Sequence, residues 1–207
     1  MSSLGQGYKY HVFLSYRHLS KVEDWVRDFF RDELTTWLRE ELDGEEPQIF
    51  WDRDGIHTGN KWEDTIGQAL LTSRCLVPVW APSYFQSNWC LAEMESFLQR
   101  EQVVSAGANS LVVPIKWHKN IPPQAPKIQP MDFTRFTWTG NGFKESSVYV
   151  GFQQRVQEFA SDLALVVKQS PVFDPSWPIL TPDEIEAAQG IPTRDPIQRM
   201  VLQRKIA

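Results

Sequence analysis

The stretch Tyr10–Tyr16 reads YHVFLSY, an aromatic-rich apolar run with polar residues on both sides. Short apolar runs of this kind are typical of a buried β-strand. Ser20 follows as a potential N-cap, and apolar residues then recur at helical spacing through Lys21–Leu42 until Gly44, a natural stop. The opening of the chain therefore predicts a strand followed by a long amphipathic helix.

The same alternation of short apolar runs and helical patterns continues along the chain. The further strands that we expect are Gln48–Trp51, Cys75–Trp80, Leu111–Ile115 and an edge strand Phe133–Thr137. The further helices are Trp62–Leu71, Trp89–Gln102 and Val148–Lys168. Repeated strand–helix units predict an α/β fold, with a central parallel sheet of about five strands flanked by helices.

The overall composition limits the classes of partner. Hydrophobic residues make up 42% of the 207 residues, enough for a packed core, and the formal net charge is −5. A mildly acidic chain without a Lys/Arg cluster has no general attraction for nucleic acid. The apolar runs are far shorter than the about 20 residues of a membrane-spanning helix. With no hydrophobic signal segment in Met1–Tyr8, we expect a cytoplasmic location and no direct contact with nucleic acid or membrane.

The special residue types add two expectations. Cys75 and Cys90 are too few for a disulfide framework, and no two histidines are spaced as a metal pair, so we expect two reduced thiols and no metal site. The nine tryptophans are unusual. Because Trp is mostly a core or interface residue, they suggest self-association or ligand stacking without deciding between them.

The character of the chain changes after Lys168, where six prolines break up Gln169–Ala207. We expect one α/β domain over residues 1–168 and a Pro-rich extension or linker over residues 169–207. Short helices are predicted at Pro182–Gln189, capped by Thr181, and at Arg194–Ile206. Such an extension packs on the domain or on a neighbour, or links to a partner.

The ligand site of an open parallel sheet lies outside the carboxyl ends of its strands. The segments expected there are Ser15–Ser20, Asp52–Trp62 and Trp80–Trp89. No Gly-rich phosphate loop, GxSxG elbow or HExxH motif occurs, so nucleotide-binding P-loop and Rossmann sites have no motif support. His18 and His57 fall in two of these segments and are candidate ligand contacts. His11 falls in a predicted strand and is expected to be a core or edge residue.

Glu93 is the most informative carboxylate. It comes four residues after Trp89 near the start of a predicted helix, so the two side chains share one face. A Glu at this helix N-terminus would sit in the ligand crevice, with its charge stabilised by the helix dipole. The alternative is a Glu that only complements that dipole, and the pattern alone leaves both open.

Four sequence elements occur in order and carry a resemblance. They are the FLSYR core of Tyr10–Arg17, the Asp52–Trp62 loop with Gly59, Ser73-Arg74 before an apolar strand, and Ser87-Asn88-Trp89-Cys90 followed by Glu93. Over about Tyr8–Lys168, the set resembles the Toll/interleukin-1 receptor (TIR) domain family, particularly bacterial TIR enzymes of immune systems. This resemblance implies a flavodoxin-like fold and, often, cleavage of NAD. His57 and Thr58 depart from the family's loop pattern, as does the extension after Lys168.

The resemblance also implies roles for individual residues. Trp89-x-x-x-Glu93 is similar to the element that carries the catalytic Glu, which would stabilise an oxocarbenium-like ribosyl centre as nicotinamide leaves. Arg17 would contact a phosphate, or be a surface arginine. Trp62 would stack on nicotinamide or adenine, or pack on the core. Trp89 would shape and dry the site, and Cys90, without an evident base, is a poor nucleophile.

Two functions of different class follow from the resemblance. The first is an NAD glycohydrolase or ADP-ribosyl cyclase that uses NAD as substrate, needs no other cofactor and is activated by self-assembly in bacterial immune defence. Its Asp52–Lys61 loop would complete a neighbour's site in open filaments, with a sensor domain or effector as a further partner. The second is a non-catalytic adaptor that acts through TIR–TIR assembly, although an adaptor has no need of Glu93. A deoxyribosyltransferase of similar fold is a weaker third option.

Overall fold

The structure is a computed structural model that describes residues 7–18, 20–51, 62–104 and 110–189. Its centre is a five-stranded parallel sheet with the order β2-β1-β3-β4-β5. The strands are β1 (Tyr10–Ser15), β2 (Ile49–Phe50), β3 (Ser73–Trp80), β4 (Ile115–Lys116) and β5 (Met131–Asp132). This is the flavodoxin-like order, and it confirms the predicted fold class.

The predicted strand Leu111–Ile115 differs in extent from the observed β4. Leu76 pairs with Val112 and Val79 with Ile115, which is one register, but Pro78 and Pro114 lie between these pairs. Proline has no backbone N–H to donate, so the ladder is interrupted there and β4 is shorter than the apolar run Leu111–Ile115.

The predicted edge strand Phe133–Thr137 was wrong in position. The strand is Met131–Asp132, and the chain turns directly after it. The Asp132 carboxylate accepts the backbone N–H of Thr134 at 2.8 Å, and the N–H of Phe136 donates to the carbonyl of Phe133 at 2.8 Å. These bonds close a turn, and Phe133 is fully buried because it packs into the core from that turn.

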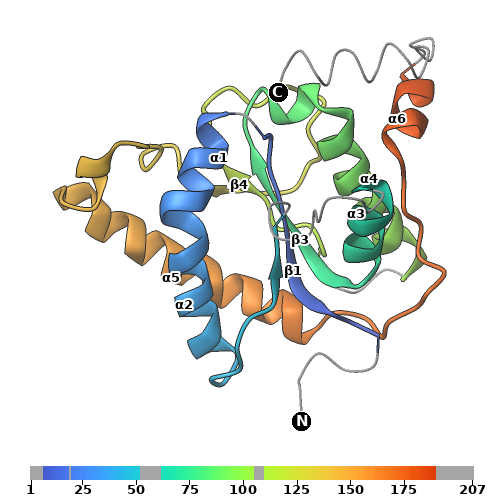
Figure 1. Ribbon diagram of the computed structural model, residues 1–207, viewed down its shortest axis with the longest axis horizontal. Coiled ribbons are helices and arrows are strands. Elements are labelled where there is room, and N and C mark those ends of the chain that lie inside the picture. The colour runs from blue at the N-terminus through green and yellow to red at the C-terminus, as the bar shows by residue number, and fades with distance from the viewer. Residues whose placement is uncertain (1–6, 19, 52–61, 105–109, 190–207) are drawn as a thin grey trace.

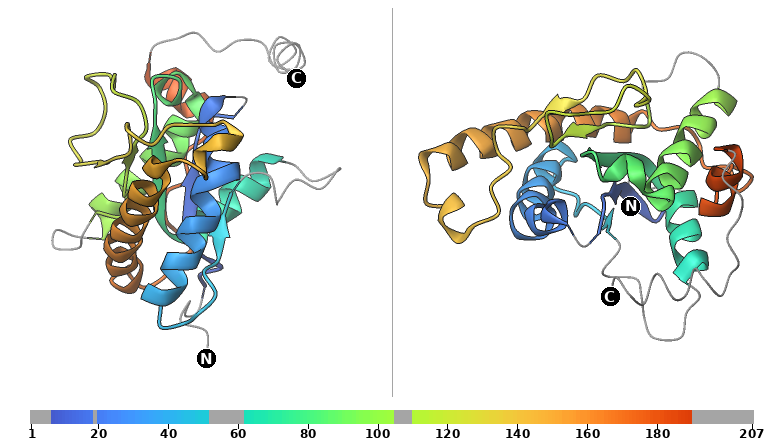
Figure 2. Two further views of the ribbon diagram at one scale, coloured as in Figure 1. Left: turned by 90° about the vertical axis from the view of Figure 1, so that its left-hand side faces the viewer. Right: turned by 90° about the horizontal axis from the view of Figure 1, so that it is seen from above.

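Helices cover both faces of the sheet (Figure 1). One face carries α1 (Lys21–Trp25), the π-helical turn η1 (Val26–Phe30), α2 (Arg31–Glu41) and α5 (Ser147–Lys168). The other carries α3 (Trp62–Leu71) and α4 (Asn88–Val103). Short 3₁₀ turns lie at η2 (Tyr84–Gln86) and η3 (Asn141–Phe143). Figure 2 shows the same two helical layers from the side and from above.

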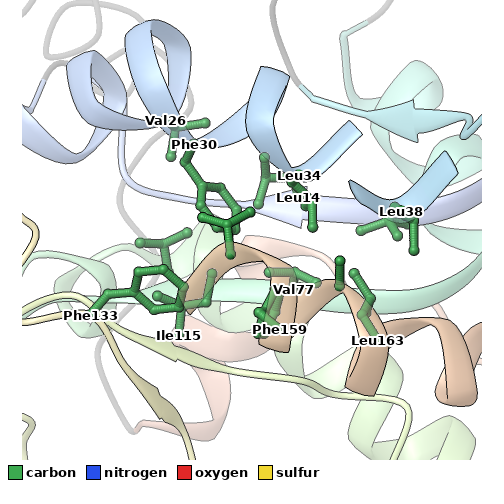
Figure 3. Close-up of a cluster of buried hydrophobic side chains, with 14 of the residues drawn as sticks. Leu14, Val26, Phe30, Leu34, Leu38, Val77, Ile115, Phe133, Phe159 and Leu163 are labelled. Atoms are coloured by element: carbon green, nitrogen blue, oxygen red, sulfur yellow. The ribbon is translucent and has the colours of Figure 1, made fainter. Parts of the chain in front are cut away.

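Each helical layer has its own apolar core against the sheet. In Figure 3, the strand residues Leu14, Val77 and Ile115 face α1–α2 and α5. The helix residues that meet them include Val26, Phe30, Leu34, Leu38, Phe159 and Leu163. The apolar spacing in Lys21–Leu42 therefore identified a core face correctly, although the helix contains a π-turn that no periodicity indicates.

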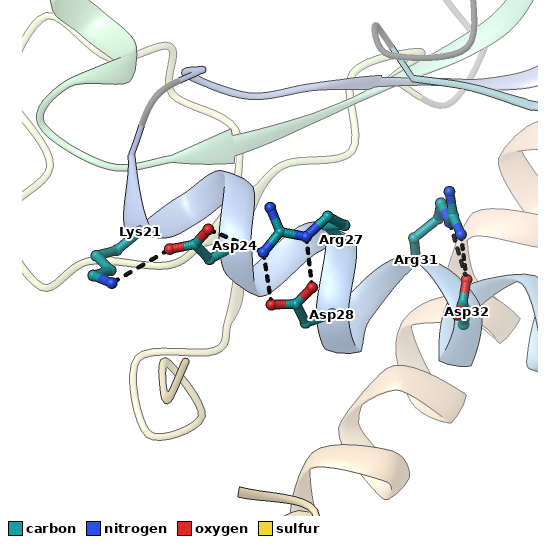
Figure 4. Close-up of polar contacts among 6 residues, drawn as sticks. All are labelled: Lys21, Asp24, Arg27, Asp28, Arg31 and Asp32. Atoms are coloured by element: carbon teal, nitrogen blue, oxygen red, sulfur yellow. Dashed lines mark hydrogen bonds and ion pairs between the residues drawn. The ribbon is translucent and has the colours of Figure 1, made fainter. Parts of the chain in front are cut away.

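The outer face of α1–α2 is charged. Arg27 pairs with Asp24 and Asp28, and Arg31 pairs with Asp32, all at the surface (Figure 4). Exposed ion pairs of this kind contribute about 0–1 kcal/mol each, so this layer is held by its apolar side. Within the described residues, no helix is both long enough and apolar enough to cross a membrane.

The C-terminal segment, residues 169–189, packs back onto the α/β domain. It ends in α6 (Pro182–Ala188), which lies beside α4, and Thr181 and Glu184 form a capping box at its start. The hydroxyl of Tyr8 donates to the carbonyl of Pro171 at 2.9 Å, and the backbone N–H of Leu180 donates to Ser96 Oγ at 2.9 Å. The predicted helix Arg194–Ile206 lies outside the described residues.

Candidate active site

A pocket of about 400 Å³ opens between α3, α4, the loop after β1 and the C-terminal segment. Its lining includes five of the residues that the sequence places at or next to the carboxyl ends of strands. These are Arg17, Gln86, Ser87, Asn88 and Trp89. Ala92 and Glu93 continue the same wall along α4. The pocket therefore lies where a flavodoxin-like sheet binds its ligands.

Glu93 lines this pocket and is only 8% exposed. It shares the pocket wall with Trp89, as their spacing on one helical face predicts. The N-cap of α4 is Ser87, whose side chain accepts the N–H of Cys90, so Glu93 lies in the second turn of the helix. The helix dipole acts mainly within the first turn. The alternative that Glu93 only complements this dipole is therefore less favoured.

A buried chain of hydroxyl groups contacts Glu93 from the sheet side. Ser15 Oγ donates to Glu93 Oε2 at 2.5 Å and lies 2.9 Å from the hydroxyl oxygen of Tyr84. The Tyr84 hydroxyl in turn donates to the carbonyl oxygen of Cys90 at 3.0 Å. Burial, together with the neighbouring Cys90 and Glu93, raises the pKa of Tyr84 well above its ordinary value, so this phenol stays protonated.

The sequence hypothesis did not include Ser15 or Tyr84 as site residues. Both lie in segments expected at the ligand edge of the sheet, Ser15 as the last residue of β1 and Tyr84 in the loop after β3. Their positions were therefore a usable signal. The hydrogen bond from Ser15 to Glu93 was not, because it joins residues 78 positions apart in the chain.

Arg17 is half-buried. Among the described residues that line the pocket, it is the one with a positive charge. Its Nη1 donates to Ser87 Oγ at 3.3 Å, which holds the guanidinium at the start of α4. A planar guanidinium at a pocket edge suits a phosphate oxygen.

His18 lies next to this region but outside the pocket lining. Its ring packs on Tyr16 with centroids 4.9 Å apart, and its Nδ1 is 4.0 Å from a carboxylate oxygen of Glu23. His57 and the remainder of the Asp52–Lys61 loop lie outside the described residues. Trp62 is the first residue of α3, and its side chain is not among those that the structure describes.

The far wall of the pocket comes from the C-terminal segment, which the sequence hypothesis did not assign to the site. Its lining residues are Ile179, Leu180, Thr181, Pro182, Asp183 and Glu186. Asn88 Nδ2 donates to Glu186 Oε1 at 2.9 Å and so connects the first residue of α4 to α6. A tail more than 80 residues further along the chain thus faces the helix that carries Glu93.

The other reactive side chains are held in unreactive states. Cys75 and Cys90 are free and buried, and burial raises the pKa of the Cys75 thiol to about 12 and that of Cys90 higher still. Neither is a thiolate at neutral pH. His11 is fully buried, and its Nδ1 accepts the backbone N–H of Gln48 at 2.9 Å, as expected for a core residue. Among the described residues, no group of three or more His, Cys, Asp or Glu side chains is placed to hold a metal ion.

Comparison with known proteins identifies relatives of the chain. The family model of the TIR domain matches residues 12–146. A curated relative, the NAD(+) hydrolase TirS of Staphylococcus aureus (strain MSSA476), is 31% identical over 111 residues, which cover 54% of this chain and 35% of that protein. The match thus spans about a third of the relative's length.

Two solved structures are similar in fold. The TIR domain of the Toll-related receptor TRR-2 from Hydra magnipapillata has a TM-score of 0.44 and 16% identity, covering 72% of this chain and 99% of that one. The TIR domains of the activated Roq1 resistosome that recognises the pathogen effector XopQ have a TM-score of 0.39 and 21% identity, covering 76% and 84%. With both scores below 0.5, the fold class rests on the sheet order described above.

Proposed function

Because the chain belongs to the TIR domain family, we propose that it cleaves the bond between nicotinamide and ribose in NAD, with Glu93 as the catalytic carboxylate. The observation that carries this proposal is the placement of Glu93, a buried carboxylate that lines a pocket at the ligand edge of the sheet. The 31% identical relative that is named an NAD(+) hydrolase supports the choice of substrate.

The chemistry suits a carboxylate in this position. As the C–N bond breaks, nicotinamide leaves with the electron pair, and positive charge develops on the ribosyl carbon. A carboxylate in a partly dehydrated pocket stabilises that charge more strongly than it would in water. Water then adds to the ribosyl carbon and loses a proton, which gives ADP-ribose. If a nucleophilic atom of the same nucleotide adds instead, the product is a cyclic isomer.

The pocket lining carries charges of both signs. Arg17 would hold the diphosphate, and the carboxylates of Glu93, Asp183 and Glu186 suit the cationic nicotinamide ring. Trp89 would exclude water from the reacting centre. NAD is the substrate in this proposal, and no further cofactor is needed for the step.

Self-assembly is the second part of the proposal. The TIR resemblance favours a site completed by the Asp52–Lys61 loop of a neighbouring subunit, with bacterial immune defence as the setting and a sensor or effector as partner. If so, specific activity rises with protein concentration. A mixture of Glu93→Gln protein with a variant broken at Gly55–Gly59 regains activity, because one intact composite site forms between them. If specific activity does not change with protein concentration and the mixture stays inactive, the hypothesis of a shared site is wrong. The proposal of NAD cleavage is not affected by that result.

The decisive experiment is incubation of the purified chain with NAD, followed by chromatography of the products. We expect nicotinamide with ADP-ribose or a cyclic isomer, and a kcat at least about a hundredfold lower for Glu93→Gln. The matched control is Glu95→Gln, two residues along α4, where the carboxylate contacts Gln99 and does not line the pocket. A folded Glu93→Gln variant with wild-type turnover would end the assignment. Absence of turnover by the assembled wild-type chain would favour a non-catalytic adaptor.

A further inference from the structure

The chain of hydroxyls behind Glu93 is fully enclosed by protein. Ser15 is 1% exposed and Tyr84 is not exposed, so bulk water does not take part in their hydrogen bonds. The chain runs from the carbonyl of Cys90 through Tyr84 and Ser15 to Glu93 Oε2. It joins the end of β1, the loop after β3 and the helix α4, so three separate elements fix one carboxylate.

Counting hydrogens shows what each protonation state of Glu93 requires of this chain. Each hydroxyl carries one hydrogen, and Ser15 can donate its hydrogen to only one acceptor. With Glu93 ionised, Ser15 donates to the carboxylate, and Tyr84 donates to Cys90 or to Ser15 Oγ. With Glu93 protonated and donating to Ser15, Ser15 donates to Tyr84 and Tyr84 donates to Cys90, so the hydrogen count by itself excludes neither state. The 2.5 Å distance from Ser15 to Glu93 matches a hydroxyl donating to a charged oxygen.

A glutamate carboxylate is otherwise poorly fixed in orientation. The last torsion of the side chain is broad and roughly twofold, so the plane of the carboxylate turns easily unless an oxygen is held. The reaction depends on alignment of the carboxylate with the charge that develops on the ribosyl carbon. A carboxylate that rotates freely therefore lowers the rate without preventing substrate binding.

We propose that Ser15, supported by Tyr84, is a positioning residue that holds the catalytic Glu93 as an oriented carboxylate. This inference rests on the proposed function and deepens it. Ser15 acts through Glu93 and not on NAD, because it is buried behind the carboxylate and outside the pocket lining. Tyr84 acts one step further away, so its effect is the smaller one.

The test compares Ser15→Ala and Tyr84→Phe with Ser73→Ala. Ser73 is a matched control, since it is fully buried, and its Oγ also makes a 2.6 Å hydrogen bond, but to Ala69 and outside the pocket lining. For Ser15→Ala we expect kcat to fall about 10–100-fold with KM within about threefold, and for Tyr84→Phe a kcat loss of about threefold. For Ser73→Ala we expect a comparable loss of stability with kcat unchanged.

Two readouts separate positioning from a general loss of structure. The lost donor stabilised the ionised carboxylate, so the acid limb of the kcat–pH profile moves to higher pH in Ser15→Ala and stays in place in Ser73→Ala. The ¹³C resonance of the Glu93 carboxyl, assigned by its absence in Glu93→Gln, titrates at higher pH in the same variant. This second readout needs no turnover.

The outcomes are distinct. If Ser15→Ala keeps the wild-type kcat, or loses activity only to the extent that Ser73→Ala does with no change in either pH curve, the positioning role is wrong. If wild-type protein cleaves no NAD, the proposed function fails. The carboxyl titration then still decides whether Ser15 holds the charged form of Glu93.

Discussion

Replacement of Trp177 by alanine tests whether the C-terminal segment is an integral part of the domain. Trp177 is 6% exposed, and its indole ring lies 4.2 Å from the guanidinium carbon of Arg100, which is itself fully buried. Its ring centroid is 5.8 Å from that of Tyr8 and 5.6 Å from that of Phe173. One side chain thus joins the segment to both the N-terminal stretch and α4.

The magnitude follows from the size and burial of the group removed. Truncating a buried tryptophan to alanine costs about 3–5 kcal/mol, a range that includes the lost stacking on Arg100. Arg100 keeps its 2.8 Å hydrogen bonds to the carbonyls of Ser73 and Leu70, so these two donors stay satisfied in the variant. For a chain of this length, the loss corresponds to a melting temperature lower by about 6–20 °C.

Circular dichroism melts and urea titrations measure the loss, and limited proteolysis detects release of residues 169–189. The control is Trp138→Ala, in which a tryptophan that is 60% exposed is removed, with an expected change of about 0.5 kcal/mol or less. Since the segment forms one wall of the pocket, we also expect the KM for NAD to rise in Trp177→Ala. If Trp177→Ala matches Trp138→Ala in stability and protease resistance, the segment is not part of the folded unit.

Three further predictions concern the site and the core. Asn88→Ala and Glu186→Ala each remove one partner of the 2.9 Å hydrogen bond between α4 and α6, and steady-state kinetics should show a raised KM for NAD in both. An unchanged KM would show that this pair does not contribute to substrate binding. Burial lowers the pKa of His11, so as pH falls through about 6.5 the unfolded chain binds a proton that the folded chain does not, and stability falls by up to about 1.4 kcal/mol per pH unit. In urea titrations His11→Asn should lose less stability than wild type between about pH 7 and pH 5, and parallel losses would contradict this. Trp62→Ala should weaken NAD cleavage through substrate positioning and Trp62→Phe should restore much of it, whereas unchanged kcat and KM in the alanine variant would make Trp62 purely structural.

The sequence by itself determined the order of elements and the identity of the candidate carboxylate. Periodicity in Tyr10–Tyr16 and Lys21–Leu42 is local, because the alternation of strand and helix faces is imposed by neighbours a few residues apart. The same holds for the pairing of Trp89 with Glu93 on one face of α4. The predicted strand Phe133–Thr137 was misplaced because its apolar residues pack from a turn, where apolar content no longer reports strand geometry.

The tertiary structure decided what surrounds that carboxylate. The hydrogen bond from Ser15 to Glu93 and the bond from Asn88 to Glu186 join residues 78 and 98 positions apart, and no local pattern specifies such contacts. The surroundings of Arg100 were likewise not predictable from a local pattern. In the sequence it is an ordinary basic residue in the last turn of a helix. In the structure it is enclosed by Trp177 and by the carbonyls of Leu70 and Ser73. Hydrogen bonding and burial depend on which surfaces meet, so a sequence can nominate a reactive group, whereas the folded chain sets its orientation and its access to water.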